Sequence, residues 1–184
     1  MIQAGSMGVP YIPVRGLAGT DVFKRRDDMI IATNPFDPTE ETVVALAQNP
    51  NVAILHAQKA DRDGNALLRK HGEDVMVAQA SHRVIVTAEE IVDKVTADDE
   101  GGQFISAINV TAVVHAPGGA HPAGVPGYYE QDADHIREYM RAASDEALFR
   151  QYLAKYVIGK TEEEYQAMVR QGSRVESHAA GGGA

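Results

Sequence analysis

Cysteine is absent from this chain of 184 residues, which excludes disulfides, thiolate zinc sites, iron–sulfur clusters and a cysteine nucleophile. Basic clusters are scarce: the net charge is −9, and the short run Lys24 to Arg26 is followed at once by Asp27 and Asp28. We therefore expect no nucleic-acid partner, because phosphate neutralisation needs clustered lysine and arginine. No apolar run approaches the roughly 20 residues of a membrane span, and no secretory signal pattern precedes Met7. We expect a cytoplasmic protein that does not bind a membrane.

Nucleotide-binding and metal-ligand patterns are also missing. The chain has neither a Gly-x-Gly-x-x-Gly fingerprint nor a P-loop, which disfavours dinucleotide and nucleoside triphosphate enzymes. Its seven histidines show no His-x-x-x-His pair and no clustering with carboxylates at ligand spacing, so we predict no metal site. His71, His82, His135 and His178 are expected to be solvated. The segment Asp61 to Asn65 resembles the opening of a calcium loop, but the required Gly and Glu positions hold Ala66 and Gly72, and we interpret it as a turn.

Short apolar segments separated by turns dominate the first two thirds of the chain. Their lengths and patterns predict strands at 10–14, 29–33, 43–47, 51–56, 83–87 and 108–114, a turn at 34–38, and helices at 75–80 and 89–94. Helical spacing follows over 132–143, 145–157 and 162–171, with Ser144 as a predicted N-cap and a capping box at Thr161. We predict an α/β fold with a mostly parallel sheet, flanking helices and a C-terminal helical cover. It would form a single domain over 1–175 with a disordered tail over 176–184.

The turn beyond the strand at 108–114 is the most informative stretch, reading VHAPGGAHP from Val114 to Pro122. Open α/β sheets bind ligands just outside the carboxyl ends of their strands, where glycine lets the backbone approach a substrate. Gly118 and Gly119 are thus candidates for lining a pocket, with their amides or by shaping it. His121 in this turn and His56 at another strand end would face the same site. A loop histidine that only hydrogen-bonds the backbone is an equally ordinary interpretation of His121.

Two further candidates have competing structural explanations. Glu89 and Glu90 follow a predicted strand and could bind substrate or do acid–base work. The alternative is a capping box in which Glu90 returns to the amide of Thr87, and this alternative is favoured. Arg15, at the end of the first strand, could clamp a carboxylate or phosphate or could pair with Asp21.

The motifs, taken in order, resemble the alpha subunit of family I coenzyme A transferases. The resemblance is of the glutaconate type and extends to the related coenzyme A transferase-like subunits of steroid-ring degradation. It rests on GVPYIPVRG from Gly8, NVAILHAQKAD from Asn51, RVIVTAEEIV from Arg83, and PGGAHP from Pro117 with GYY behind it. It implies the family's α/β fold and a hetero-oligomer in which the partner is a homologous beta subunit. The implied substrate-binding residues are Arg15, His56, Gln58, Glu89, Glu90, Gly118, Gly119 and His121.

The resemblance also implies the chemistry. A glutamate that the beta subunit supplies attacks the acyl-CoA thioester and forms a mixed anhydride. Coenzyme A then passes to the glutamate as a thioester, from which an acceptor acid takes it. Coenzyme A is a substrate in this scheme, and no separate cofactor is expected. The matched motifs correspond to the C-terminal part of an alpha subunit. In the steroid-pathway relatives an active-site glutamate of the alpha subunit precedes the segment that matches Met1 to Gly8, so we assign no catalytic residue within these 184 positions.

Two other functions stay open on this resemblance. One is a coenzyme A transferase-like hydrolase that opens a carbocyclic ring in steroid breakdown, which the helical segment at 159–165 favours. The other is a truncated, non-catalytic subunit that only binds a partner.

Overall fold

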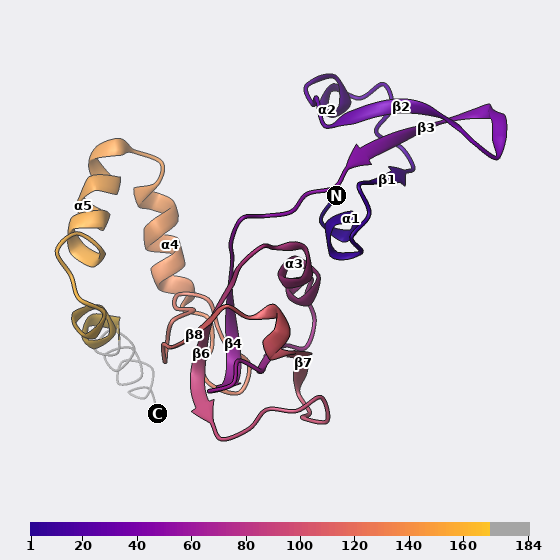
Figure 1. Ribbon diagram of the computed structural model, residues 1–184. Helices are drawn as coiled ribbons and strands as arrows, with labels where there is room; N and C mark the ends of the chain where they lie inside the picture. Colours follow the sequence, from indigo (N-terminus) through magenta and orange to yellow (C-terminus); the bar gives the residue numbers. More distant parts are fainter. Residues whose placement is uncertain (170–184) are drawn as a thin grey trace, which may run out of the picture. The chain divides into compact units, whose positions relative to one another are not determined.

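The computed structural model describes residues 1–169 and divides the chain into two compact units, Met1–Gly119 and a unit that starts at Ala120 (Figure 1). The tail predicted for 176–184 lies outside the described residues, and the single domain over 1–175 stays a prediction. Within residues 1–169, no helix combines the length and the apolar character needed to cross a membrane.

The first unit opens with a small antiparallel sheet. Helix α1 (Ile2–Ser6) precedes β1 (Tyr11–Val14), α2 (Asp21–Lys24), β2 (Met29–Asn34) and β3 (Asp37–Leu46), and the sheet order is β1-β3-β2. The strands predicted at 10–14 and 29–33 are confirmed. The predicted turn is shorter than 34–38, because the Asn34 side chain accepts a hydrogen bond from the Phe36 amide (2.9 Å) and reverses the chain within two residues. The strand predicted at 43–47 therefore starts six residues earlier.

A five-stranded sheet forms the rest of this unit. Its members are β4 (Ala53–Asp61), β5 (Ala66–Arg69), β6 (Val84–Val92), β7 (Gly102–Ile105) and β8 (Ala112–His115), in the order β7-β5-β4-β6-β8. Strands β4, β6 and β8 are parallel, while β5 and β7 join antiparallel. The α/β class is confirmed, with a mixed sheet that is parallel in the half carrying the predicted site.

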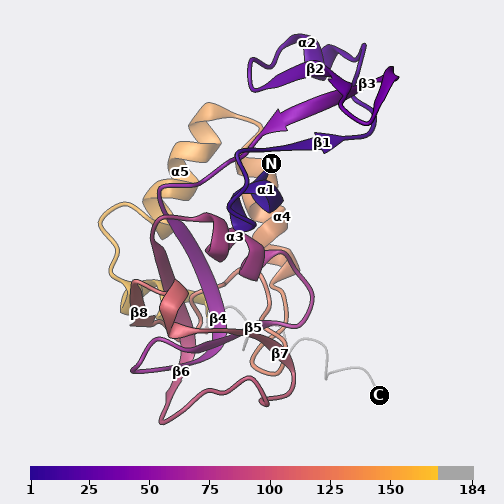
Figure 2. The ribbon, with the colours of Figure 1, turned by 45° about the vertical axis from the view of Figure 1, so that its right-hand side comes forward.

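The core of the unit lies on one face of this sheet. Alternate residues of β4 and β6 are buried, as period-two side chains require, and they pack with residues of β5, β7 and helix α3 (Asp74–Ala80). Figure 2 shows α3 beside α1, between the two sheets. The helix predicted at 75–80 is confirmed. The core residues of the two central strands are Ala53, Leu55, Ala57, Val84, Val86 and Ala88.

Two predicted boundaries beyond this core are wrong. The helix predicted at 89–94 does not form, because β6 continues to Val92 and pairs with β4 along its length. Glu89 and Glu90 are therefore strand residues, and the capping box with Thr87 does not exist. The strand predicted at 108–114 begins only at Ala112, since the 3₁₀ turn η1 (Ala107–Asn109) precedes it. In β6, pairing between distant segments overrides the local preference for a helix.

The turn from Asp61 to Asn65 is confirmed, and the Asp61 carboxylate holds it. This side chain is 1% exposed and accepts hydrogen bonds from the amides of Gly64 and Asn65 and from the Asn65 side chain, each at 2.9 Å. A fourth bond comes from the Val95 amide at 3.0 Å. Gly64 has φ +106°, a backbone conformation that favours glycine.

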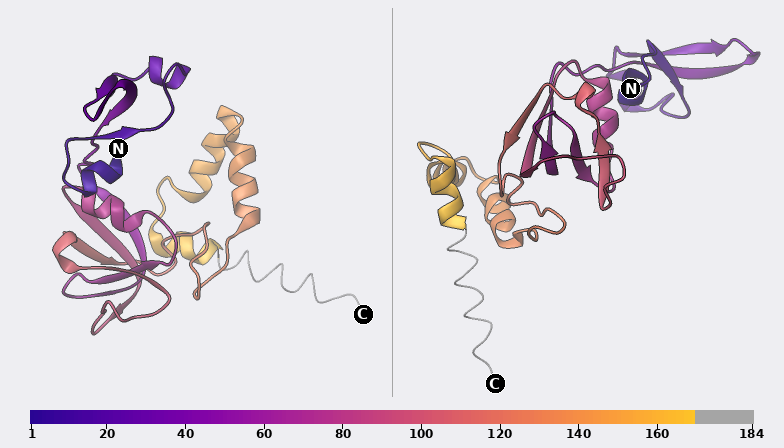
Figure 3. Two further views of the ribbon diagram at one scale, coloured as in Figure 1. Left: turned by 90° about the vertical axis from the view of Figure 1, so that its right-hand side faces the viewer. Right: turned by 60° about the horizontal axis from the view of Figure 1, so that its bottom comes forward.

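The second unit is helical. It contains α4 (Ala133–Ala142), α5 (Glu146–Tyr156) and a helix over 162–169, and Figure 3 shows α4 and α5 side by side and antiparallel.

Asp145, not the predicted Ser144, caps α5 by accepting from the Leu148 amide (2.9 Å). The predicted capping box is confirmed: Thr161 N–H donates to Glu164 Oε2 (2.9 Å), and Glu164 N–H donates to Thr161 Oγ1 (3.3 Å). The end of the predicted helix, at 170–171, lies outside the described residues.

We expect Val86→Ala to lower the free energy of unfolding by about 1–3 kcal/mol, because the fully buried side chain leaves a cavity in the core. Urea unfolding followed by circular dichroism measures this loss. The matched control is Ile54→Ala on the neighbouring strand, whose side chain is 71% exposed and whose change should stay within about 0.5 kcal/mol. Equal losses in both variants would contradict the placement of the core on one face.

Candidate functional site

Three polar side chains lie in adjacent positions on the face of the five-stranded sheet opposite the core. His56 of β4 is in parallel register with Thr87 of β6. Glu89 follows Thr87 by two residues and so points to the same face. In the first half of β4, His56 and Gln58 therefore alternate with the core residues Leu55 and Ala57.

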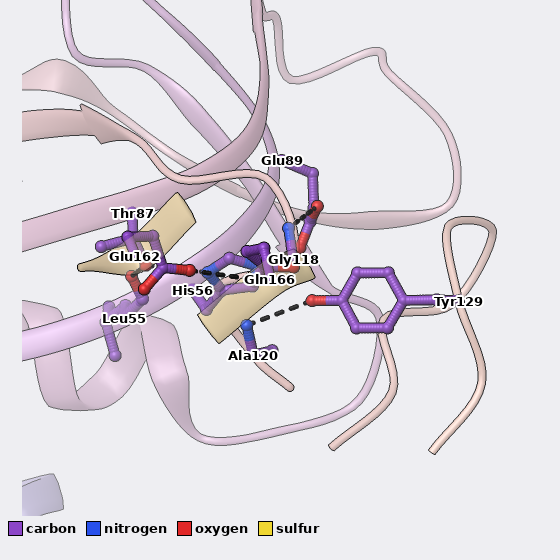
Figure 4. A network of polar contacts seen from close by, with 9 residues as sticks. All are labelled: Leu55, His56, Thr87, Glu89, Gly118, Ala120, Tyr129, Glu162 and Gln166. Carbon is purple, nitrogen blue, oxygen red and sulfur yellow. Dashed lines mark hydrogen bonds and ion pairs between the residues drawn. The ribbon is translucent and has the colours of Figure 1, made fainter. Parts of the chain in front are cut away.

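These side chains form one hydrogen-bonded network (Figure 4). His56 Nδ1 lies 2.8 Å from Thr87 Oγ1, and His56 Nε2 lies 2.7 Å from Glu89 Oε1. The Thr87 hydroxyl also reaches the Leu55 carbonyl at 3.3 Å. Because a carboxylate only accepts, the Nε2–H of His56 donates to Glu89, and Thr87 can serve Nδ1 as donor or acceptor.

Glu89 also holds the glycine turn. Gly118 N–H donates to Glu89 Oε2 at 2.7 Å, so both oxygens of a side chain that is only 4% exposed are bound. Both oxygens of this buried carboxylate hold neighbouring groups in place, which suits a positioning role. Glu89 thus ties His56 to the turn that follows β8.

The two glycines shape the site, but their amides are already engaged. The N–H of Gly118 is bound to Glu89, and that of Gly119 donates to the Ala116 carbonyl at 3.0 Å. The interpretation of these amides as pocket-lining donors is therefore wrong. A Cβ at Gly119 would lie 2.8 Å from the Ala116 oxygen and 3.2 Å from Cε1 of His56, so glycine is needed for the imidazole to approach the turn.

The structure brings together some of the predicted binding residues. His56, Glu89, Gly118 and Gly119 are in one cluster, and Gln58 lies in register with Glu89 on the adjacent strand. Glu90 is on the opposite face and exposed. Arg15 is exposed at the end of β1, in the other sheet. Its alternative partner Asp21 instead pairs with Lys24 at 3.2 Å.

His121 belongs to a separate cluster in the second unit. Its Nε2 lies 3.2 Å from Asp132 Oδ2, and its Nδ1 lies 2.7 Å from the hydroxyl of Tyr165. His135, in the first turn of α4, lies 2.7 Å from the Tyr152 hydroxyl through Nε2. The expectation of a solvated His135 is wrong: it is 6% exposed. His71 and His82 are exposed as predicted, and His178 lies outside the described residues.

Burial shifts the pKa of two members of this second cluster. Burial lowers the pKa of His135, and the nearby His121 lowers it further. Burial likewise raises the pKa of Tyr165 to about 12. The spacing Asp132-x-x-His135 is the signal that the sequence offered. An N-cap aspartate followed three residues later by histidine places the two groups together on the first turn of a helix.

We expect Gly119→Ala to displace the His56 imidazole, because the added methyl group cannot fit between the Ala116 carbonyl and the ring. Overpacking of this kind costs about 1–3 kcal/mol of stability. NMR of the His56 ring nitrogens reports the displacement, and His115→Ala on the exposed part of β8 serves as control. Unchanged His56 resonances in Gly119→Ala would contradict the close packing.

The sequence model of one protein family, described as Coenzyme A transferase, matches residues 1–116. The chain belongs to the coenzyme A transferase family. This match includes β4, β6 and β8, and with them His56, Thr87 and Glu89. The resemblance expected from the ordered motifs is thereby confirmed.

Similar proteins in this family have different activities. The chain is 37% identical over 172 residues to a 3-oxoadipate CoA-transferase subunit of Pseudomonas knackmussii, covering 92% of this chain and 60% of the relative. It is 29% identical over 184 residues to the cholesterol ring-cleaving hydrolase IpdA subunit of Rhodococcus jostii, covering 92% and 60%. The solved structure of glutaconate coenzyme A-transferase from Acidaminococcus fermentans superposes with a TM-score of 0.82 at 29% identity, covering 91% and 59%. The chain thus spans about 60% of the length of each of these transferase-family proteins.

Proposed function

We propose that this chain contributes one wall of the active site of a coenzyme A transferase, as part of its alpha subunit. The observation that carries the proposal is the His56–Glu89–Gly118 network, because its two side chains lie within the family match and fix a glycine turn just beyond the carboxyl end of β8. Ligands of open α/β sheets bind at such positions. The substrates would be an acyl-CoA and a free carboxylic acid, with no cofactor beyond the coenzyme A that is transferred.

The partner would be a beta subunit that supplies the nucleophile. Its glutamate attacks the thioester carbonyl, and coenzyme A leaves as the thiolate. The thiolate then attacks the glutamyl carbonyl of the anhydride and releases the first acid. The acceptor acid reverses both steps and leaves with coenzyme A. In this scheme the nucleophile comes from the beta subunit, and Glu89 positions His56 and Gly118.

The residues of this chain that would meet the substrate surround that network. His56, Gln58 and the turn at Gly118 and Gly119 form the wall, and His121 and Arg15 stay as predicted contacts. Glu90 lies on the other face of β6 and is not part of this wall. Without cysteine, the chain suits a reducing compartment, and we propose the cytoplasm.

The test is an exchange assay on the complex of this chain with its beta-type partner. An isotopically labelled dicarboxylic acid is incubated with unlabelled acyl-CoA, and label that enters the thioester pool shows transfer. His56→Gln in this complex should lower the exchange rate at least about 10-fold, while His71→Gln, which changes an exposed histidine, leaves it unchanged. A complex that assembles without any exchange would contradict the proposal and favour a non-catalytic, partner-binding role.

Hydrolytic opening of a carbocyclic ring in a coenzyme A thioester is the second candidate, because the chain is 29% identical to the ring-cleaving hydrolase subunit. The two functions differ in the acceptor. A hydrolase adds water, so oxygen from labelled water would appear in the product without any exchange between acids. The greater identity to the transferase relative, at 37%, favours transfer.

A further inference from the structure

We propose that His121, Asp132 and His135 form a binding site for a divalent transition-metal ion of the zinc class. Each residue offers one ligand atom, and these atoms lie within 4.8 Å of one another. All three belong to the second unit. The inference does not depend on the proposed transferase function.

The spacing of two of these donors is that of atoms sharing a metal. His121 Nε2 and Asp132 Oδ2 are 3.2 Å apart. Two donors bound tetrahedrally to zinc at about 2.0–2.1 Å lie roughly 3.3–3.4 Å from one another. A charge-assisted hydrogen bond between the same groups is typically shorter, about 2.7–2.9 Å. The pair is therefore close to the separation that coordination needs.

Each of the three donor side chains is also held in position by a hydrogen bond from another group. One nitrogen of each imidazole is held by a tyrosine hydroxyl at 2.7 Å, from Tyr165 for His121 and from Tyr152 for His135. This leaves the second nitrogen of each ring to coordinate. Asp132 Oδ1 accepts from the His135 amide at 2.8 Å, which fixes the carboxylate. Metal-bound histidines almost always have such a partner on their second nitrogen, and it sets the orientation of the ring.

The donor set selects the class of ion. Two imidazoles with one carboxylate suit zinc and similar first-row ions, whereas calcium and magnesium prefer oxygen ligands throughout. Three protein donors leave a fourth position for water. An ion bound there would join the segment around His121 to the first turn of α4, and it would stabilise the folded second unit because the unfolded chain lacks the site.

The site is tested on the full chain after treatment with a chelator, by calorimetric titration with zinc chloride alone. We expect one equivalent to bind. Asp132→Asn should weaken binding at least about 10-fold while circular dichroism stays unchanged, because asparagine also caps a helix. Tyr165→Phe should weaken binding about 10–100-fold through the lost contact to His121. His71→Gln, which changes an exposed histidine of the first unit, is the matched control and should bind as the wild type does.

Cobalt(II) gives a second measurement that needs no variant. Visible absorption of four-coordinate cobalt, removed by one equivalent of zinc, would support the site. Equal zinc affinity in the wild type and Asp132→Asn, or a cobalt spectrum no different from that of the aqueous ion, would overturn it. The cluster would then be a hydrogen-bonded network only.

Discussion

Replacing Glu89 by alanine is expected to lower the free energy of unfolding by about 2–4 kcal/mol and, under the proposed function, to stop coenzyme A exchange by the complex with the beta-type partner. The reason is that two donors lose their acceptor at once: His56 Nε2–H and the Gly118 amide. A donor left unsatisfied in a buried place costs about 1–3 kcal/mol. The glycine turn would also lose its connection to β6.

Denaturant unfolding followed by circular dichroism measures the first effect, and the coenzyme A exchange assay measures the second. Glu90→Ala is the matched control, since this neighbour is exposed on the other face of the strand. Glu89→Gln keeps the shape of the side chain and removes its charge. Its amide oxygen can accept from one of the two donors, whereas its NH₂ group faces the other donor and cannot accept from it. A loss below about 1 kcal/mol in Glu89→Ala would contradict the positioning role.

Asp61→Ala is expected to cost about 3–5 kcal/mol, because four donors converge on this buried carboxylate. The turn between β4 and β5 and the segment at Val95 would lose their common acceptor. The control is Asp63→Ala, an exposed residue of the same turn, which should change the unfolding free energy by less than about 0.5 kcal/mol.

The contribution of Asp61 should also depend on pH. Burial alone would raise the pKa of this carboxyl, but hydrogen bonds from Asn65, Val95 and Gly64 outweigh it and hold the pKa below its ordinary value. A lowered folded-state pKa means that the stabilisation is complete above the unfolded pKa of about 4 and is lost as the pH falls below it. The difference in unfolding free energy between wild type and Asp61→Ala should therefore narrow in acid. A constant difference would contradict this assignment.

The strands of the site could be predicted from sequence, but their ends could not. The apolar run at Ala53 and the run at Val84 identify β4 and β6, and their alternation gives the core residues. Nothing local indicates that β6 continues through Glu89, because Thr87 with Glu90 also fits a capping box. Pairing with β4, which lies far from β6 along the chain, decides the matter.

The sequence identified the individual residues of the site, but it did not show which of them are hydrogen-bonded to each other. His56 and Glu89 both follow apolar runs, which identifies them as candidates near strand ends. That the two residues bind each other depends on the parallel register, which sequence spacing does not contain. The same holds for His135: its burial depends on Tyr152, which comes from another helix.

The alternation along β4 has an evolutionary consequence. One set of positions (Ala53, Leu55, Ala57) packs in the core, and the interleaved set carries the proposed substrate contacts (His56, Gln58). A point substitution in the second set can alter reactivity while the scaffold persists, whereas inserting or deleting one residue would exchange the two sets and ruin both. A fold with this separation can diversify its reactions by substitution, and transferases and a ring-cleaving hydrolase are both found among its relatives.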